Sequence, residues 1–129
     1  MPTIVDHRRP VAVTSGPRFH FHGYYDKTPW DPSGRYIAAL ETAFVDRPPA
    51  ADDTAVVGLV DTAGDNAWLP LASTQAWNWQ QGSMIHWLGP TADPAFVQND
   101  VRDGVLVSVV RALDGEEVRG LPMPVYAVS

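Results

Sequence analysis

The amino-acid sequence predicts an all-β protein made of short antiparallel strands. Twelve prolines and ten glycines among the 129 residues interrupt most windows in which a helix could form. Apolar residues seldom recur at the spacing of an amphipathic helix, whereas short β-branched runs recur between turns. The hydrophobic content of 45%, which includes five tryptophans, is enough to form the core of one domain of this length.

The expected strands of the first half are separated by turn residues. A short apolar run at 36–40 follows a turn that contains Pro32 and Gly34. The polar, proline-rich segment 45–53 is expected to be an exposed loop. The β-branched run at 55–60 predicts the next strand, and it ends at a turn.

The last strand of the first half is expected at 67–72, where Pro70 is typical of the edge of a sheet. A second series of apolar runs follows. Its expected strands are residues 84–88, 95–98, 105–110 and 116–121. The run at 105–110 (Val-Leu-Val-Ser-Val-Val) is the most strand-like in the chain.

The two series can be laid over each other. The matching segments are 23–30 with 80–87, 36–40 with 95–98, and 55–60 with 105–110. Each unit then has four antiparallel strands, and units of about 40 to 50 residues are typical of β-propeller blades. A β-sandwich, which also uses about seven short strands in a hundred residues, is the alternative.

On the propeller interpretation, residues 1–129 are a single domain and the N-terminal portion of an incomplete propeller. Blade one is expected at about 19–73, blade two at about 76–122 and the opening strand of a third at about 124–129. Open blade faces expose apolar area, so we expect self-association or marginal stability for the truncated chain.

The charge balance excludes one class of partner. The net charge is -6, and no Lys/Arg cluster is present that could neutralise phosphates, so no nucleic-acid partner is expected. Cysteine is absent, which excludes disulfides and thiolate metal sites. No apolar run is long enough for a signal peptide or a membrane span. The default location is therefore cytoplasmic, without membrane contact, while a periplasmic or secreted location stays open.

Residues 30–38 (Trp-Asp-Pro-Ser-Gly-Arg-Tyr-Ile-Ala) resemble the Trp-Ser-Pro-Asp-Gly-Lys-x-Ile-Ala motif of TolB-like β-propellers. In that family the turn joins the innermost strand of a blade to the second strand. Ser33 stands where the family has Asp, and Asp31 stands where it has Ser. The second copy, which begins at Trp87, is degenerate.

Two patches are similar to oligogalacturonate-lyase-type propellers, namely 22–27 (His-Gly-Tyr-Tyr-Asp-Lys) and 78–82 (Asn-Trp-Gln-Gln-Gly). The resemblance implies six or seven blades and action on acidic oligosaccharides. The metal-binding histidines of those lyases lie in later blades, past Ser129. The resemblance therefore implies no cofactor in this segment and leaves room for a divalent metal in a full-length protein.

The first candidate patch lies at 18–27. If this segment is extended, its side chains alternate between two faces, and His20, His22, Tyr24 and Asp26 share one of them. Innermost propeller strands border a channel where polar side chains can meet a ligand. The candidate ligand-binding residues here are His22, Tyr24, Tyr25, Asp26 and Lys27. Structural hydrogen bonds and packing between blades are the alternative role for these side chains.

The second candidate patch contains Trp77, Trp79 and Trp87 together with Gln80 and Gln81. An indole face beside amide donors suits a sugar ring, which offers C–H groups to the indole and hydroxyls to the amides. We expect substrate-binding roles for Trp79 and Gln81, with inter-blade packing as the alternative.

Metal and nucleophile chemistry have little support in the sequence. His20 and His22 could share a metal with His86 as a third ligand, but Asp26 is too far along the strand to complete the set. We assign no metal site. No Gly-x-Ser-x-Gly or phosphate-binding loop is present, so catalytic residues are unknown and enzyme activity is left open.

The expected function is that of a ligand-binding module for a glycan or a protein, without catalysis of its own. The alternative is a set of substrate-binding blades of an oligogalacturonate-lyase-like enzyme. In that alternative Lys27 would neutralise a uronate carboxylate.

Overall fold

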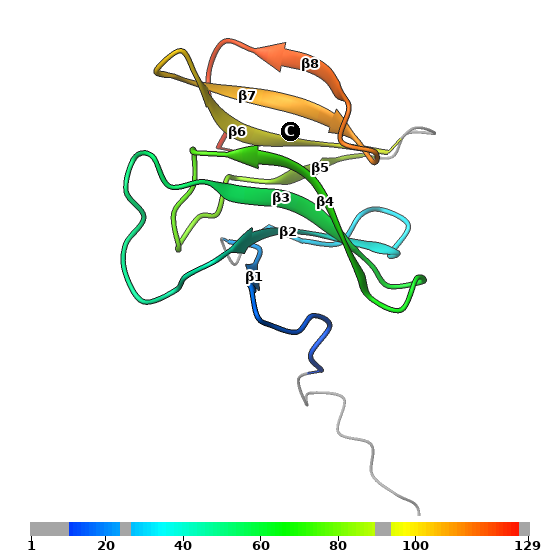
Figure 1. Cartoon of the computed structure of the whole chain (residues 1–129). Coiled ribbons are helices and arrows are strands. Elements are labelled where there is room, and N and C mark those ends of the chain that lie inside the picture. Colours follow the sequence, from blue (N-terminus) through cyan, green and yellow to red (C-terminus); the bar gives the residue numbers. More distant parts are fainter. Residues whose placement is uncertain (1–10, 24–26, 90–93, 127–129) are drawn as a thin grey trace, which may run out of the picture.

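The structure is a computed structural model that describes residues 11–23, 27–89 and 94–126. Eight strands form two four-stranded sheets that lie face to face, and the described residues contain no helix (Figure 1). The first sheet comprises β1 (Phe19–Phe21), β2 (Tyr36–Thr42), β3 (Ala55–Asp61) and β4 (Ala67–Thr74). The second comprises β5 (His86–Leu88), β6 (Ala95–Arg102), β7 (Val105–Ala112) and β8 (Glu117–Leu121).

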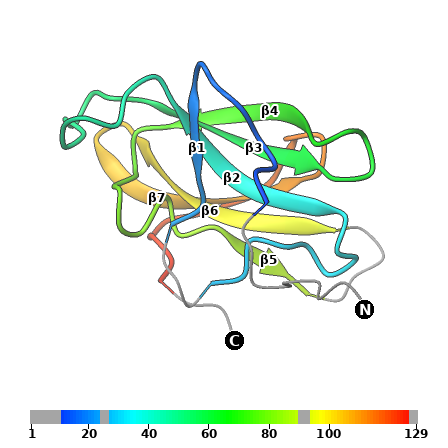
Figure 2. The same cartoon turned by 90° about the horizontal axis from the view of Figure 1, so that it is seen from below.

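Both sheets are antiparallel meanders in which neighbours in sequence are neighbours in space. Their strand orders are β1-β2-β3-β4 and β5-β6-β7-β8, and neither sheet is closed into a barrel (Figure 2). The all-β prediction with four-stranded antiparallel units is therefore confirmed. In an immunoglobulin-type sandwich, the chain crosses several times between the two sheets. Among the described strands it crosses here once, from β4 to β5.

The predicted strand positions hold, but several boundaries differ. β6 continues four residues past the predicted end at Gln98, because polar side chains at its end find partners within the fold. β5 begins two residues later than predicted, since Met84 has a φ of 54°, outside the β region. Pro70 lies in β4 at the edge of its sheet, as predicted, beside a register shift between Val57 and Gly58.

The expected extended segment 18–27 is not one continuous strand. The described strand β1 ends at Phe21, and Gly23 has a φ of 138° that turns the chain. Trp30 then pairs alone with Ile37 of β2. The alternation of faces predicted for 18–27 therefore fails after His22.

The core lies between the two sheets. Alternate residues of β2 and β3 face the second sheet, and the apolar ones among them are fully buried. The buried cluster consists of Ala38, Leu40, Ala55, Val57, Leu59, Trp77, Ile85 and Phe96. Phe96 of β6 is the largest of the fully buried side chains, so the second sheet contributes the central contact.

Polar side chains extend this layer on the second sheet. Gln98, Asp100 and Arg111 lie on the same face of their sheet as Phe96, and each is at most 8% exposed. Arg111 donates from Nε to Oε1 of Gln98 over 2.8 Å and from a terminal nitrogen to the carbonyl oxygen of Gly115 over 3.0 Å. These partners occupy two of the five N–H donors of the guanidinium.

The turn that enters β2 is organised by one carboxylate. Asp31 is 4% exposed and accepts hydrogen bonds from the backbone N–H groups of Ser33, Arg35 and Tyr36 and from the Ser33 hydroxyl. Burial alone would raise the pKa of Asp31, but these four donors hold it below its ordinary value. Asp31 therefore supplies the capping interactions of the Pro-Ser-Gly turn.

The segment after β8 crosses the outer face of the second sheet (red in Figure 2). The Ser108 hydroxyl donates to the carbonyl oxygen of Met123 over 2.8 Å. The Asn99 side chain pairs with both backbone polar groups of Val125, at 2.7 and 3.0 Å. Residues 124–126, the described part of the opening strand expected at 124–129, are held to the sheet through the Asn99 side chain. Residues 127–129 lie outside the described part.

Across residues 11–23, 27–89 and 94–126, no helix has the length and apolar character needed to cross a membrane.

Candidate functional site

Two glycines bring the two candidate sequence patches into contact. A Cβ atom on Gly23 would lie 2.6 Å from the carbonyl oxygen of Gln81, and one on Gly82 would collide with the carbonyl oxygen of His22. Both glycines also have positive φ values, 138° and 60°. Backbones can approach this closely only where neither residue has a side chain. The contact therefore places His22 and Gln81 at one junction between the sheets.

His22 is held in its neutral form at this junction. Its Nδ1 donates to the carbonyl oxygen of Ala38 over 3.0 Å. Burial lowers the pKa of His22, and the electrostatic interaction with His86 lowers it further, while the Ala38 hydrogen bond opposes the shift. Nε2 of His86 donates to the carbonyl oxygen of Tyr126 over 2.9 Å. His22 directly follows β1 and His86 begins β5, the first strands of the two sheets.

Lys27 follows this junction four residues after Gly23. Its ammonium lies 5.2 Å from the ring centroid of Tyr126, within the range of a cation–π interaction. The other three candidates of the first patch, Tyr24, Tyr25 and Asp26, lie outside the described residues.

A cavity of about 310 Å³ adjoins the junction and is lined by carboxamides. Gln75, Asn78, Gln81 and Asn99 supply the amides, and Trp77 with apolar neighbours supplies the rest of the wall. We call it the amide cavity. All the described residues that line it are uncharged.

The loop that carries Gln81 is pinned by Asn78. The Asn78 Oδ1 atom accepts from the backbone N–H of Gln81 over 2.7 Å, and the backbones of Asn78 and Gly82 exchange two hydrogen bonds of 3.1 and 2.9 Å. The side chain of Gln81 is therefore presented from a closed loop rather than from a strand. This fixed loop gives the amide cavity a preformed wall.

The three tryptophans of the second patch are engaged in packing. Their indole N–H groups donate to backbone carbonyl oxygens of Asp53, Arg47 and Pro29, from Trp77, Trp79 and Trp87 respectively, over 2.8 to 3.0 Å. The Trp79 ring lies 4.9 Å from that of Trp77, in an edge-to-face arrangement, and it also contacts Phe21 and Phe44. Trp79 is thus placed in an aromatic cluster, and only Trp77 of the three lines the amide cavity.

The His-x-His pair has separate partners. His20 donates to Glu41 over 2.9 Å and lies against Trp68, with 4.7 Å between the ring centroids and 56° between the ring planes, whereas His22 donates to the carbonyl oxygen of Ala38. Among the described residues, no three His, Cys, Asp or Glu side chains are grouped in a way that could hold a metal ion.

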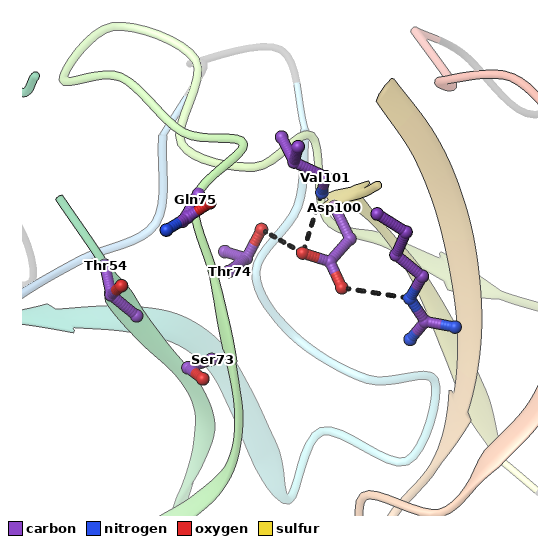
Figure 3. A pocket seen from close by; sticks show the side chains of 7 residues that line it. Thr54, Ser73, Thr74, Gln75, Asp100 and Val101 are labelled. Atoms are coloured by element: carbon purple, nitrogen blue, oxygen red, sulfur yellow. Dashed lines mark hydrogen bonds and ion pairs between the residues drawn. The ribbon is translucent and has the colours of Figure 1, made fainter. Parts of the chain in front are cut away.

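A second cavity was missed by sequence reasoning. It has a volume of about 290 Å³ and lies between the start of β3 and the ends of β4 and β6 (Figure 3). Thr54, Ser73, Thr74 and Gln75 line one side, and Asp100 and Arg102 line the other. We call it the Asp100 cavity. The sequence signal was weak, because an Asp at the end of an apolar run looks like the start of a loop.

The carboxylate of Asp100 is fixed in place. Oδ1 accepts from the Thr74 hydroxyl over 3.1 Å and from the backbone N–H of Val101 over 2.8 Å. Oδ2 faces Nε of Arg102 at 3.5 Å, and Arg102 also donates to Glu117 over 2.8 Å. Figure 3 shows the carboxylate between the threonine and the guanidinium, facing the cavity.

Comparison of the chain with protein-family models, with curated proteins and with solved structures gave no match. The function is therefore inferred from the arrangement of the side chains alone.

Proposed function

We propose that this chain is a pair of adjacent blades of a TolB-like β-propeller that binds an oligosaccharide without catalysing a reaction. The propeller part rests on the repeat of one connectivity in two stacked sheets. It also rests on equivalent pairings at the innermost strand positions, where Trp30 lies opposite Ile37 and Trp87 lies opposite Phe96. In the overlay of the two sequence units, Trp30 corresponds to Trp87 and Ile37 corresponds to Phe96.

The contact of Gly23 with Gly82 is the observation that carries the binding proposal. It joins two patches that were selected separately for their polar and aromatic side chains. A backbone contact that excludes every side chain keeps the loop of Gln81 against the end of β1. The amide cavity beside it is thereby held open in one shape, which lowers the entropic cost of binding.

The lining of the amide cavity matches the groups of a sugar. A carboxamide can donate to one hydroxyl and accept from another. The amides of Asn99 and Asn78 are bonded to Val125 and to the Gln81 loop, so the amides of Gln75 and Gln81 are the ones that can meet the hydroxyls of a ring. Trp77, Met84 and Leu106 offer apolar surface to the C–H groups of the ring. Because the wall is uncharged, a neutral sugar needs no compensating ion there.

The second candidate function is that of substrate-binding blades for an acidic oligosaccharide. The observation that favours it is the ammonium of Lys27, which lies 5.2 Å from the ring centroid of Tyr126, whose carbonyl oxygen accepts from His86. Lys27 would then neutralise a uronate carboxylate. Removal of its charge distinguishes this function from the first.

The experiment is a titration of the chain, followed by ¹H–¹⁵N NMR, with neutral tetrasaccharides of glucose, galactose, mannose or N-acetylglucosamine and with tetragalacturonate. We expect a neutral sugar to bind, and we expect Gln81→Ala to weaken it about fivefold or more, the equivalent of one lost hydrogen bond. Gln80→Ala is the matched control, since Gln80 is exposed and lies outside the cavity lining.

Two outcomes would contradict this proposal. If none of the sugars binds, the proposed function is wrong. If Gln81→Ala and the unaltered chain bind the sugar with equal affinity, the binding site does not include Gln81. Tight binding of tetragalacturonate that Lys27→Ala abolishes would establish the second function instead.

A further inference from the structure

A third cavity lies on the outer face of the first sheet, away from the core between the sheets. In β2 the side chains of Ala38 and Leu40 face the second sheet, so Ile37 and Ala39 face the other side. The cavity has a volume of about 150 Å³, and we call it the imidazole cavity because two histidines line it. Its apolar wall is formed by Val13, Phe21, Pro29, Ile37, Ala39 and Val60.

The imidazole cavity is enclosed by the fold on several sides. Ala39 and Val60 are at most 5% exposed although they lie on the outer face of their sheet. Val13 and Thr14, from the segment before β1, line the space next to them. An apolar cavity of about 150 Å³ is large enough to hold one benzene-sized ring. The size and the wall therefore suit a single small ring.

The polar part of the lining consists mainly of two imidazoles whose proton positions are set by their partners. A carboxylate can only accept, so Nε2 of His20 donates to Glu41 over 2.9 Å. A carbonyl oxygen can also only accept, so Nδ1 of His22 donates to Ala38 over 3.0 Å. In a neutral imidazole the other nitrogen is then a hydrogen-bond acceptor.

The second nitrogen of each ring is not used within the described part of the fold. Among the described residues, Nδ1 of His20 and Nε2 of His22 have no hydrogen-bond partner. The side chain of His20 is 9% exposed, and burial lowers the pKa of His22, which favours its neutral form. A buried acceptor without a partner is stabilised by a ligand that brings a donor to it.

We infer that the imidazole cavity binds a small apolar ring that carries a hydrogen-bond donor, of which phenol is the simplest example. The wall contacts the ring, and an imidazole nitrogen accepts from its hydroxyl. A carboxylate ligand has no donor to offer and would lose its water, which selects against that class. A sugar would place several hydroxyls against an apolar wall without partners. The described lining shares no residue with the amide cavity, so the two proposals are tested independently.

The test is a titration followed by ¹H–¹⁵N NMR at pH about 8, where an ordinary histidine is neutral. The ligands are phenol, fluorobenzene and benzoate, which share one ring and differ in donor and charge. Ala39→Leu fills the cavity and leaves both histidines in place. Ala51→Leu is the matched control, since Ala51 is exposed and lines none of the three cavities.

We expect phenol to bind at least fivefold more tightly than fluorobenzene, the equivalent of about one hydrogen bond, and benzoate not to bind. Ala39→Leu should weaken the binding of phenol at least about tenfold, because the ring no longer fits. His20→Phe and His22→Phe keep a ring and remove an acceptor. At least one of them should abolish the preference for phenol while fluorobenzene still binds. A spectrum of each variant without ligand establishes that its fold is intact.

Several outcomes would overturn this inference. Equal affinities of phenol and fluorobenzene would show that no donor is recognised. Absence of phenol binding, tighter binding of benzoate, or unchanged phenol binding by Ala39→Leu would each show that the cavity is not the site described. If either histidine variant fails to fold, the ligand series and Ala39→Leu decide by themselves.

Discussion

The two sheets have the same strand order and direction but offer different faces to the layer between them. β2 and β3 present small and medium apolar side chains, such as Ala38, Leu40 and Leu59. β6 and β7 place Phe96 in the same layer together with the polar pair Gln98 and Arg111. One topology thus accepts both an apolar and a mixed face, provided that each buried polar group finds a partner. Four experiments test this difference between the sheets. They remove core volume, a turn interaction, one member of a polar pair and a titratable side chain.

The largest effect is expected from loss of core volume. Phe96→Ala should lower the free energy of unfolding by about 3–5 kcal/mol and Leu59→Ala by about 2–5 kcal/mol, since both side chains are fully buried. If the sheets share one core, both variants shift a single urea transition followed by circular dichroism. Val105→Ala, at a site 55% exposed, is the control. Two separate transitions would show that the sheets unfold independently.

The turn of the first sheet is the next most sensitive feature. Asp31→Ala removes an acceptor that serves four donors and should cost about 2–3 kcal/mol. Ser33→Ala removes one of these donors and should cost less. The measurement is the urea midpoint of each variant. A cost for Asp31→Ala no greater than that for Ser33→Ala would mean that Pro32 and Gly34 fix the turn without the carboxylate.

The polar pair of the second sheet should show strong coupling. Arg111→Met leaves the Oε1 atom of Gln98 without its donor, and we expect a loss of about 1–3 kcal/mol. Adding Gln98→Leu removes the unsatisfied group, so the double variant should recover most of that loss. Additive costs in this double-mutant cycle would contradict the view that the pair is tolerated because it is mutually satisfied.

The smallest effect concerns the pH dependence of stability. The pKa of His22 is lowered in the fold, so the unfolded chain, whose histidine has a pKa of about 6.5, binds the proton more readily. The stability due to neutral His22 is therefore complete above pH about 6.5 and is lost as the pH falls through the lowered value. His22→Gln should flatten the change in urea midpoint between pH about 7 and 5. An unchanged slope would mean that His22 titrates normally.

The sequence was sufficient for the features that depend on local chemistry. Pro32 and Gly34 located the turn before β2, and Pro70 located an edge strand, because these residues restrict the backbone wherever they occur. The end of β6 was missed, since Asn99 and Asp100 resemble a loop until Val125 and Thr74 are seen as their partners. Those partners are distant in sequence.

The candidate site was predictable in part for the same reason. His22 and Gln81 were singled out by residue type, and the neighbouring Gly23 and Gly82 are visible in the sequence. The contact between Gly23 and Gly82 could not be predicted, because it depends on how the two sheets stack. The Asp100 cavity is lined by residues from the start of β3 and the ends of β4 and β6, so its prediction would have required knowledge of how the two sheets pack.

The indole N–H groups of Trp77, Trp79 and Trp87 end on backbone carbonyls, two of them within the segment that joins β2 to β3 and one at Pro29. Each ring is therefore an optical reporter of the attachment of a particular stretch of chain. Detachment of the β2–β3 connection would release two indoles and shift their emission to the red while the third kept its environment. Time-resolved fluorescence of single-tryptophan variants could follow such a local opening separately from separation of the sheets.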